Sequence, residues 1–198
     1  EAERLCLAAG ATCLFKGVPG RGGAGPFPGN ICASLNEQVV HGIPSDRQIR
    51  DGDIVSVDFG VLLDGWCGDA AETFICGEAP EPVRRLVDVT RNSLELAVQM
   101  CRPNEKWSTI ARAMQQYVES EGFSVVREFV GHGIGAEMHE DPKVPNFVSA
   151  DLVARDIVLG EGVVIAVEPM VNLGVAGVRC DSDGWTVVTA DGQASAHF

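Results

Sequence analysis

Four ionisable side chains of this sequence occupy apolar or glycine-rich stretches, where charge is costly: Asp58, Asp69, His132 and Glu168. Asp58 follows the run Ile54 to Val57, and Glu168 follows Val163 to Val167. A carboxylate in such a run must be paired, hydrogen-bonded or bound to a metal. Three carboxylates with one imidazole favour Mn, Fe or Co over a zinc site built from thiolates. We therefore interpret the four residues as candidate ligands of divalent cations.

Two strand-like runs must position the aspartates. Asp53 to Leu63 and Trp66 to Cys76 are separated only by Asp64-Gly65. This dipeptide is a strong signal for a two-residue hairpin turn, whose length fixes the pairing of the flanking strands. We therefore predict an antiparallel hairpin with Leu63 opposite Trp66.

The predicted register brings the two carboxylates to one face. Counting back from the turn sets Asp58 opposite Ala71 and Asp69 opposite Gly60, so both aspartates share a face on a diagonal of roughly 7 to 8 Å. Nearby carboxylates raise each other's pKa, which makes a cation between them the natural partner. Each aspartate alone fits a buried hydrogen bond better, but the shared face favours metal. Cys67 lies on the same face, where a small buried thiol is the ordinary interpretation.

The second pair of candidates comes from the other end of the chain. His132 lies in Gly131-His132-Gly133-Ile134-Gly135, where glycine permits close backbone approach. Glu168 precedes Pro169, which stops ladder pairing. His41-Gly42-Ile43 recurs as His132-Gly133-Ile134, a weak internal repeat that would bring ligands from both halves. The ordinary alternatives are a structural histidine and a strand-terminal surface glutamate.

The remaining pattern predicts an α+β fold. We expect helices at Glu1 to Lys16, Pro82 to Met100 and Ser108 to Ser120, a loop from Val18 to Asn30, and further strands at Cys32 to Val40, Val125 to Val130, Val163 to Glu168 and Trp185 to Thr189. A chain of 198 residues with 45% hydrophobic content can bury one core, so we expect a single domain, residues 1–198.

Composition limits the partners. A formal net charge of -13 disfavours nucleic acid and anionic membranes, which need a basic face. No uncharged apolar run approaches the roughly 18 to 20 residues that span a bilayer. Seven cysteines, an odd number without a C-x-x-C pair, fit free thiols in a reducing cytosol. We therefore expect a cytoplasmic protein without a membrane partner.

These motifs together resemble the type I methionine aminopeptidases of the pita-bread fold, in peptidase family M24. The resemblance covers most of the chain, in the stretches Asn30 to Pro44, Asp51 to Phe74, Gly131 to Phe147, Val163 to Met170 and Gly184 to Phe198. It implies a curved antiparallel sheet backed by helices, with a pseudo-twofold internal repeat and the metals on the concave face.

The resemblance implies a role for each candidate ligand. Asp58 and Asp69 would bind metal, with Asp69 bridging, while His132 and Glu168 would hold a second ion. Glu168 would also handle protons around the nucleophilic water. The cofactor would be two divalent ions, Co, Mn, Fe or Zn, which activate a bridging water and clamp the tetrahedral intermediate of amide hydrolysis.

The resemblance also implies residues that contact substrate. His139 would contact the scissile carbonyl or the intermediate, and His41 would hydrogen-bond near the substrate amide, although each is also an ordinary structural histidine. The methionine side-chain pocket would be lined by Phe27, Cys32, Met138 and Trp185, residue types that are equally common in a core. A monovalent cation would bind near Asn36 and Ser195.

The chain departs from the family pattern at its ends. Members carry a fifth ligand, a Glu that opens a Glu-His-Thr stretch directly after the segment matching Ala194 to Phe198, and the usual helix before Glu1 is missing. We therefore expect a domain incomplete at both termini and poorly active as 198 residues. The loop from Gly17 to Gly29 is also longer and richer in glycine than in many relatives.

The expected activity is removal of the N-terminal methionine from nascent proteins. The resemblance implies a preference for small second residues, and it allows a transient contact with the ribosome; we expect a monomer. One alternative within the same fold is an Xaa-Pro peptidase. The Trp185 segment and the motif His41-Gly42-Ile43-Pro44 disfavour it. A rival of another class is a non-catalytic pita-bread binding module, which would have lost metal ligands.

Overall fold

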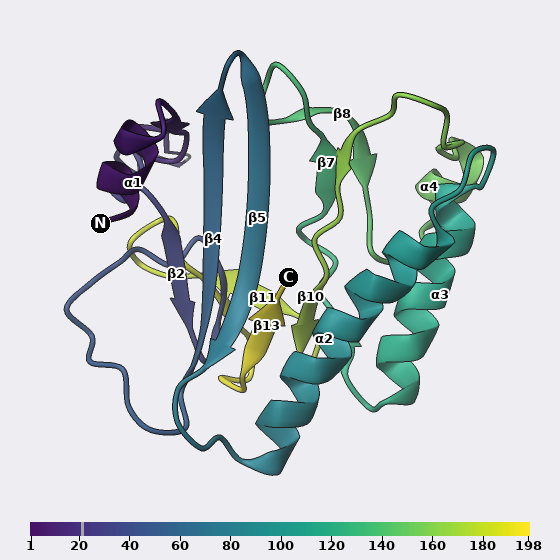
Figure 1. The fold of residues 1–198 in the computed structure, drawn as a ribbon. Coiled ribbons are helices and arrows are strands. Elements are labelled where there is room, and N and C mark those ends of the chain that lie inside the picture. The colour runs from purple at the N-terminus through teal and green to yellow at the C-terminus, as the bar shows by residue number, and fades with distance from the viewer. Residues whose placement is uncertain (21) are drawn as a thin grey trace.

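A computed structural model describes residues 1–20 and 22–198 (Figure 1). The helices are α1 (Ala2–Ala8), α2 (Glu81–Met100), α3 (Trp107–Ser120) and α4 (Ala150–Ala154). The strands are β1 (Thr12–Cys13), β2 (Cys32–Leu35), β3 (Gln38–Val40), β4 (Ile54–Leu63), β5 (Trp66–Ile75), β6 (Ser124–Val125), β7 (Gly131–Gly133), β8 (Glu140–Val144), β9 (Ile165–Ala166), β10 (Met170–Asn172), β11 (Val178–Cys180), β12 (Val187–Thr189) and β13 (Ser195–His197). The predicted α+β class is confirmed.

Strands β4 and β5 form the longest strand pair of the described residues, ten residues on each side (Figure 1). Asp64 and Gly65 both have positive φ, 51° and 83°, as a type I′ turn requires. Asp58 pairs with Ala71, and Gly60 pairs with Asp69, which is the predicted register. The two aspartates therefore lie on one face.

The strands form small antiparallel sheets. The orders are β1-β4-β2 with β5 on β4, then β13-β10-β6, β11-β12-β3 and β8-β7-β9. Register shifts interrupt β7 at His132 and β12 at Val187. Within the described residues, the antiparallel strands thus fall into four hydrogen-bonded groups.

Helices α2 and α3 pack side by side (Figure 1); α2 lies against β10 and β13, and α3 lies against β6. Their amphipathic patterns bury Leu86 and Val87 of α2 and Trp107 and Ile110 of α3. Helix α2 begins at Glu81, one residue before the predicted start at Pro82, and ends at Met100, as predicted. Among the helices of residues 1–20 and 22–198, none has both the length and the apolar composition needed to cross a bilayer.

The predicted helix from Glu1 to Lys16 is wrong beyond Ala8. Gly10 adopts a φ of 74°, which ends the helical backbone. Thr12 and Cys13 then pair with Leu62 and Val61 of β4 as strand β1. An apolar helical spacing continues through this segment, but pairing with an available sheet edge overrides it.

Other predicted strands are shorter than expected. Cys32 to Val40 divides into β2 and β3 because Asn36 turns the chain with a φ of 49°. The runs from Val125 to Val130, Val163 to Glu168 and Trp185 to Thr189 contribute only β6, β9 and β12 to sheets. Val163 and Val164 are exposed, so their apolar character does not reflect strand burial.

Two hydrogen bonds join the hairpin to the last residues of the chain, and a third, within the hairpin, supports them. Ser56 Oγ lies 2.8 Å from Thr73 Oγ1, and Thr73 Oγ1 donates to the carbonyl of His197 at 2.8 Å. The amide of His197 donates back to Thr73 Oγ1 at 2.9 Å. Because the Thr73 proton goes to the carbonyl, the Ser56 hydroxyl is the donor to Thr73.

Candidate metal centre

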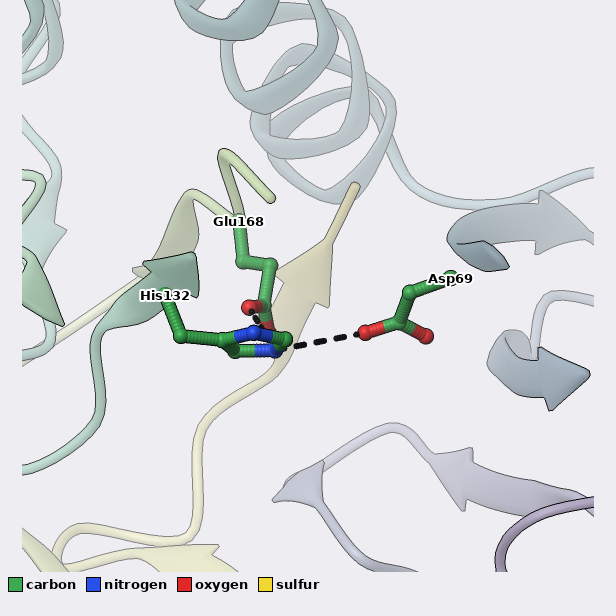
Figure 2. A group of neighbouring side chains, drawn as sticks. All are labelled: Asp69, His132 and Glu168. Carbon is green, nitrogen blue, oxygen red and sulfur yellow. Dashed lines mark ion pairs between the residues drawn. The ribbon is translucent and has the colours of Figure 1, made fainter. Parts of the chain in front are cut away.

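The structure brings Asp69, His132 and Glu168 together from three separate elements (Figure 2). Asp69 lies on β5, His132 on β7, and Glu168 two residues after β9. His132 Nε2 is 3.2 Å from Glu168 Oε1 and 3.5 Å from Asp69 Oδ2. One ligand atom from each residue falls within 4.8 Å of the other two.

The protonation of His132 indicates that a cation fits between these groups. His132 Nδ1 lies 2.8 Å from the carbonyl of Gly133, which can only accept, so Nδ1 carries the proton. In the neutral ring, Nε2 then directs a lone pair at two carboxylates. A divalent ion satisfies all three groups at once.

Unpaired buried oxygens support the same interpretation. Asp69 Oδ1 and Glu168 Oε1 are buried and have no hydrogen-bond partner among residues 1–20 and 22–198. Buried polar atoms rarely lack a hydrogen-bond partner, because nothing then compensates the free-energy cost of removing them from water. Burial lowers the pKa of His132, but hydrogen bonds to Asp69 and Gly133 and the charge of Glu168 outweigh it, so that the pKa is raised. The donor set therefore attracts positive charge.

Asp58 lies in the same cavity but is not part of the closest group. It lines a cavity of about 260 Å³ with Asp69, Glu168 and His197. Burial raises its pKa to about 7; the charge of His197 opposes the rise, and the charges of Asp69 and Glu168 add to it. The described group within 4.8 Å contains Asp69 and Glu168 but not Asp58. Asp58 therefore stands beside the three-residue group.

His197 is a site residue that the sequence analysis missed. Its Nε2 is buried, has no hydrogen-bond partner in the part of the chain that the structure describes, and lies 3.7 Å from Glu168 Oε2. Burial lowers the pKa of His197, but Glu168, Asp58 and Asp69 outweigh it and raise the pKa. Its place depends on the contact with Thr73, 124 residues away. The residues next to His197 in the sequence do not indicate that contact.

A second cavity of about 110 Å³ adjoins the candidate ligands and is mainly apolar. Its lining includes all four residues predicted for a side-chain pocket, Phe27, Cys32, Met138 and Trp185. Phe15 and Val18, which the sequence analysis did not name, also line it. Burial, with the charges of Asp58 and Asp69, raises the pKa of Cys32, so its thiol is neutral.

The two predicted substrate-contacting histidines also line this cavity. The ring of His139 is 4.3 Å from that of His132, centroid to centroid. The ring of His41 packs edge-on against Phe129 at 5.4 Å and against Trp185 at 6.5 Å. Both imidazoles therefore flank the space between the acidic group and the apolar wall.

Asn36 and Ser195 lie together but bond to the protein. The backbone amide of Ser195 donates to the Asn36 carbonyl at 2.8 Å. The Asn36 side chain donates to Asp53 Oδ1 at 2.8 Å and accepts from the amide of Ile54 at 3.0 Å. The Ser195 hydroxyl donates to the Val171 carbonyl at 3.2 Å. The expected monovalent-cation site stays a prediction.

Comparison with known proteins agrees with this geometry. The model of metallopeptidase family M24 matches residues 5–189. A protein named methionine aminopeptidase 1 from Bacillus subtilis is 46% identical over 197 residues, which span 100% of this chain and 76% of that protein.

Solved structures separate close from distant relatives. A methionine aminopeptidase from Thermotoga maritima aligns with a TM-score of 0.90 at 42% identity, covering 98% of this chain and 75% of its own. A prolidase from Pyrococcus furiosus aligns over 85% of this chain and 44% of its own with a TM-score of 0.65 at 21% identity, which shows a shared fold alone. The fold is the pita-bread fold, and the chain belongs to metallopeptidase family M24.

Proposed function

We propose that this protein is a metal-dependent aminopeptidase that removes the N-terminal methionine from nascent proteins. The observation that carries the proposal is His132 Nε2, whose lone pair faces Asp69 and Glu168 beside a mainly apolar cavity. The similarity to proteins named methionine aminopeptidase supports the same activity.

The proposed ligands are Asp58, Asp69, His132 and Glu168. Carboxylates and one imidazole suit a pair of divalent ions, and of Co, Mn, Fe and Zn we favour the first three. When bound, divalent ions supply Lewis-acid charge and lower the pKa of water at the site. The buried, unpaired oxygens of Asp69 and Glu168 support this assignment.

We assign proton transfer and substrate contacts to the chain's own groups. The Glu168 carboxylate is the proposed acceptor of a proton from the attacking water. His139 is the proposed donor to the scissile carbonyl, and His41 the proposed partner of the substrate amide. Their place on the wall of the cavity supports both roles.

The apolar cavity is the proposed pocket for the methionine side chain. Phe27 and Trp185 meet edge to face, with ring centroids 5.1 Å apart, and Met138 and Cys32 complete the lining. A thioether packs favourably against aromatic edges and polarizable sulfur. An unbranched, uncharged side chain is therefore the fitting occupant.

The remaining proposals concern organisation. We propose one metallopeptidase domain over residues 1–198, acting as a monomer in the cytoplasm, and a transient contact with the ribosome as the route to its substrate. An acidic net charge of -13 argues against recruitment through nucleic acid by a basic patch.

Peptide hydrolysis after controlled metal loading tests the function. Protein stripped with EDTA is reloaded with Co, Mn, Fe or Zn, and release of methionine from Met-Ala-Ser is compared with cleavage of an Xaa-Pro peptide. We expect metal-dependent release of methionine and no cleavage of the Xaa-Pro peptide. The reverse preference would establish the prolidase-like alternative, and absence of metal binding by equilibrium dialysis would establish a non-catalytic module.

A further inference from the structure

A glycine-rich loop, defined here as residues 18–20 and 22–27, forms part of the wall of the apolar cavity. Its base is closed by backbone hydrogen bonds: the amide of Gly17 donates to the Phe27 carbonyl, and the amide of Phe27 donates to the Val18 carbonyl, each at 2.9 Å. Val18 and Phe27 both line the cavity. A shift of this loop therefore moves two of the residues that shape the cavity.

Trp185 connects this loop to the opposite wall. The indole Nε1 of Trp185 donates to the carbonyl of Gly25 at 2.9 Å. The same ring meets Phe27 at 5.1 Å between centroids, with an interplanar angle of 70°. One side chain thus makes a directional bond to the loop and an edge contact with its cavity-lining residue.

The turn that carries Trp185 is itself fixed. Asp183 Oδ1 accepts from the amides of Trp185 and Thr186, each at 2.8 Å, and Asp183 Oδ2 accepts from the Thr186 hydroxyl at 2.6 Å. Gly184 has a φ of 77°, and a Cβ there would lie 2.7 Å from Cβ of Ala24. The loop therefore rests closely on a turn that is held by its own hydrogen bonds.

We propose that Trp185 is a positioning residue whose indole N–H holds the glycine-rich loop at Gly25 and so sets which N-terminal side chain the cavity accepts. This inference rests on the proposed function, because it concerns recognition of the methionine side chain. With Val18 and Phe27 held in place, the cavity suits an unbranched thioether or alkyl chain. Release of the loop widens the cavity and admits branched side chains.

The substitution Trp185→Phe removes the hydrogen bond to Gly25 and also places a smaller ring in the cavity lining, so amide exchange at the loop, and not KM alone, decides the anchoring role. Phenylalanine keeps an aromatic ring beside Phe27 but has no N–H for Gly25. We expect KM for Met-Ala-Ser to rise about five-fold, equivalent to about 1 kcal/mol at 1.4 kcal/mol per factor of ten, with kcat nearly unchanged. The preference in kcat/KM for Met-Ala-Ser over Leu-Ala-Ser should fall by a similar factor.

Amide hydrogen exchange gives a readout that does not depend on activity. The amides of Gly17 and Phe27, bonded across the base of the loop, should exchange about five-fold faster in Trp185→Phe than in the wild type. Metal content should not change, because Trp185 is not among the proposed ligands.

The other two tryptophans provide matched controls. Trp66→Phe changes a side chain that is 67% exposed at the hairpin tip. Trp107→Phe removes a comparable indole bond, to the Pro145 carbonyl at 2.7 Å, in the core. Neither residue lines the apolar cavity, so neither change should alter KM or the Met-over-Leu preference.

Each outcome decides the inference. Unchanged exchange at Gly17 and Phe27 in Trp185→Phe would overturn the anchoring role, whether or not the protein hydrolyses peptides. Faster exchange with unchanged KM and unchanged Met-over-Leu preference would overturn the role in selection. Failure of the metal-loaded wild type to hydrolyse Met-Ala-Ser would refute the proposed function and, with it, the selection of methionine, while the exchange measurement would still decide the anchoring.

Discussion

The two halves of the candidate metal centre are built differently. Asp58 and Asp69 stand on β4 and β5, which pair over ten residues without a break. His132 and Glu168 come from or follow β7 and β9, which are three and two residues long, and β7 has a register shift at His132. In the long β4–β5 ladder, the two-residue period of the strands decides on which face each side chain lies. In the short strands, the space around individual residues decides where the side chains lie.

The two halves differ in how the fold holds their ligands in place. We nevertheless expect the ligands of both halves to contribute equally to metal binding. Asp69→Asn on the hairpin and Glu168→Gln on the other half each remove a charged ligand. We expect kcat/KM for Met-Ala-Ser to fall about 10²- to 10⁴-fold for Glu168→Gln, because a proton acceptor is also lost. Metal affinity should fall in both by more than the roughly 10- to 100-fold that loss of an outer-shell partner costs.

Metal content after dialysis and steady-state kinetics measure these two effects. Glu161→Gln, at an exposed position, is the charge-matched control and should behave as the wild type. Normal metal binding by Asp69→Asn would break the comparison, because the hairpin would then not contribute to the site.

The acidic cluster should make the metal-free protein less stable as pH rises. Burial raises the pKa of Asp58 from 3.8 to about 7, so the folded state holds this proton more tightly than the unfolded state. Its stabilisation is present at low pH and disappears between about pH 4 and pH 7, with an upper limit of about 4 kcal/mol. The raised pKa values of His132 and His197 act in the same direction above about pH 6.5.

Thermal unfolding followed by circular dichroism tests this dependence. In EDTA, Tm should fall from pH 5 to pH 8, and added divalent cation should flatten the curve because it replaces the protons. Asp58→Asn should flatten the metal-free curve in part. A metal-free Tm that rises over this range would contradict the electrostatic account.

A substitution at a closely packed glycine of the second half should reduce the free energy of unfolding more than one at the hairpin turn of the first half. A Cβ on Gly131 would lie 2.2 Å from the Ala166 carbonyl oxygen, so Gly131→Ala forces backbone apart beside His132. We expect a loss of about 3 kcal/mol of unfolding free energy together with weaker metal binding. Urea unfolding and equilibrium dialysis provide the measurements, and unchanged metal affinity would argue that His132 is placed by other contacts.

The smallest effect is expected at the hairpin turn. Gly65 has a φ of 83°, and a Cβ there would meet nothing within 4 Å. Gly65→Ala therefore adds only backbone strain, about 1 kcal/mol in urea unfolding, and should leave metal binding intact. A loss as large as that of Gly131→Ala would abolish the distinction between the halves.

The sequence predicts this first half in detail because its information is local. Asp64-Gly65 specifies the turn, and the turn specifies the pairing of Asp58 and Asp69 with their neighbours. Helices α2 and α3 are likewise found from amphipathic spacing. These elements carry their own signals within about twenty residues.

For the second half, the sequence predicts the candidate ligands but not most of the strands around them. Strands β8 and β10 escaped notice, and the strand predicted to lead to Glu168 reduces to Ile165–Ala166, because these short strands are stabilised by partners far away in the chain. His197 shows the limit most clearly. Its backbone is fixed by Thr73, and its ring reaches Glu168 only through that distant contact.

The bond between Thr73 and His197 has a consequence for folding kinetics. The hairpin can form early, since its contacts are local, but this bond closes a loop of 124 residues and so raises contact order. His132 and Glu168 likewise lie far from Asp69 in the sequence, so the candidate metal group also forms by long-range contacts. Metal added to refolding protein should therefore bind in the slowest phase, and it should slow unfolding more than it speeds folding.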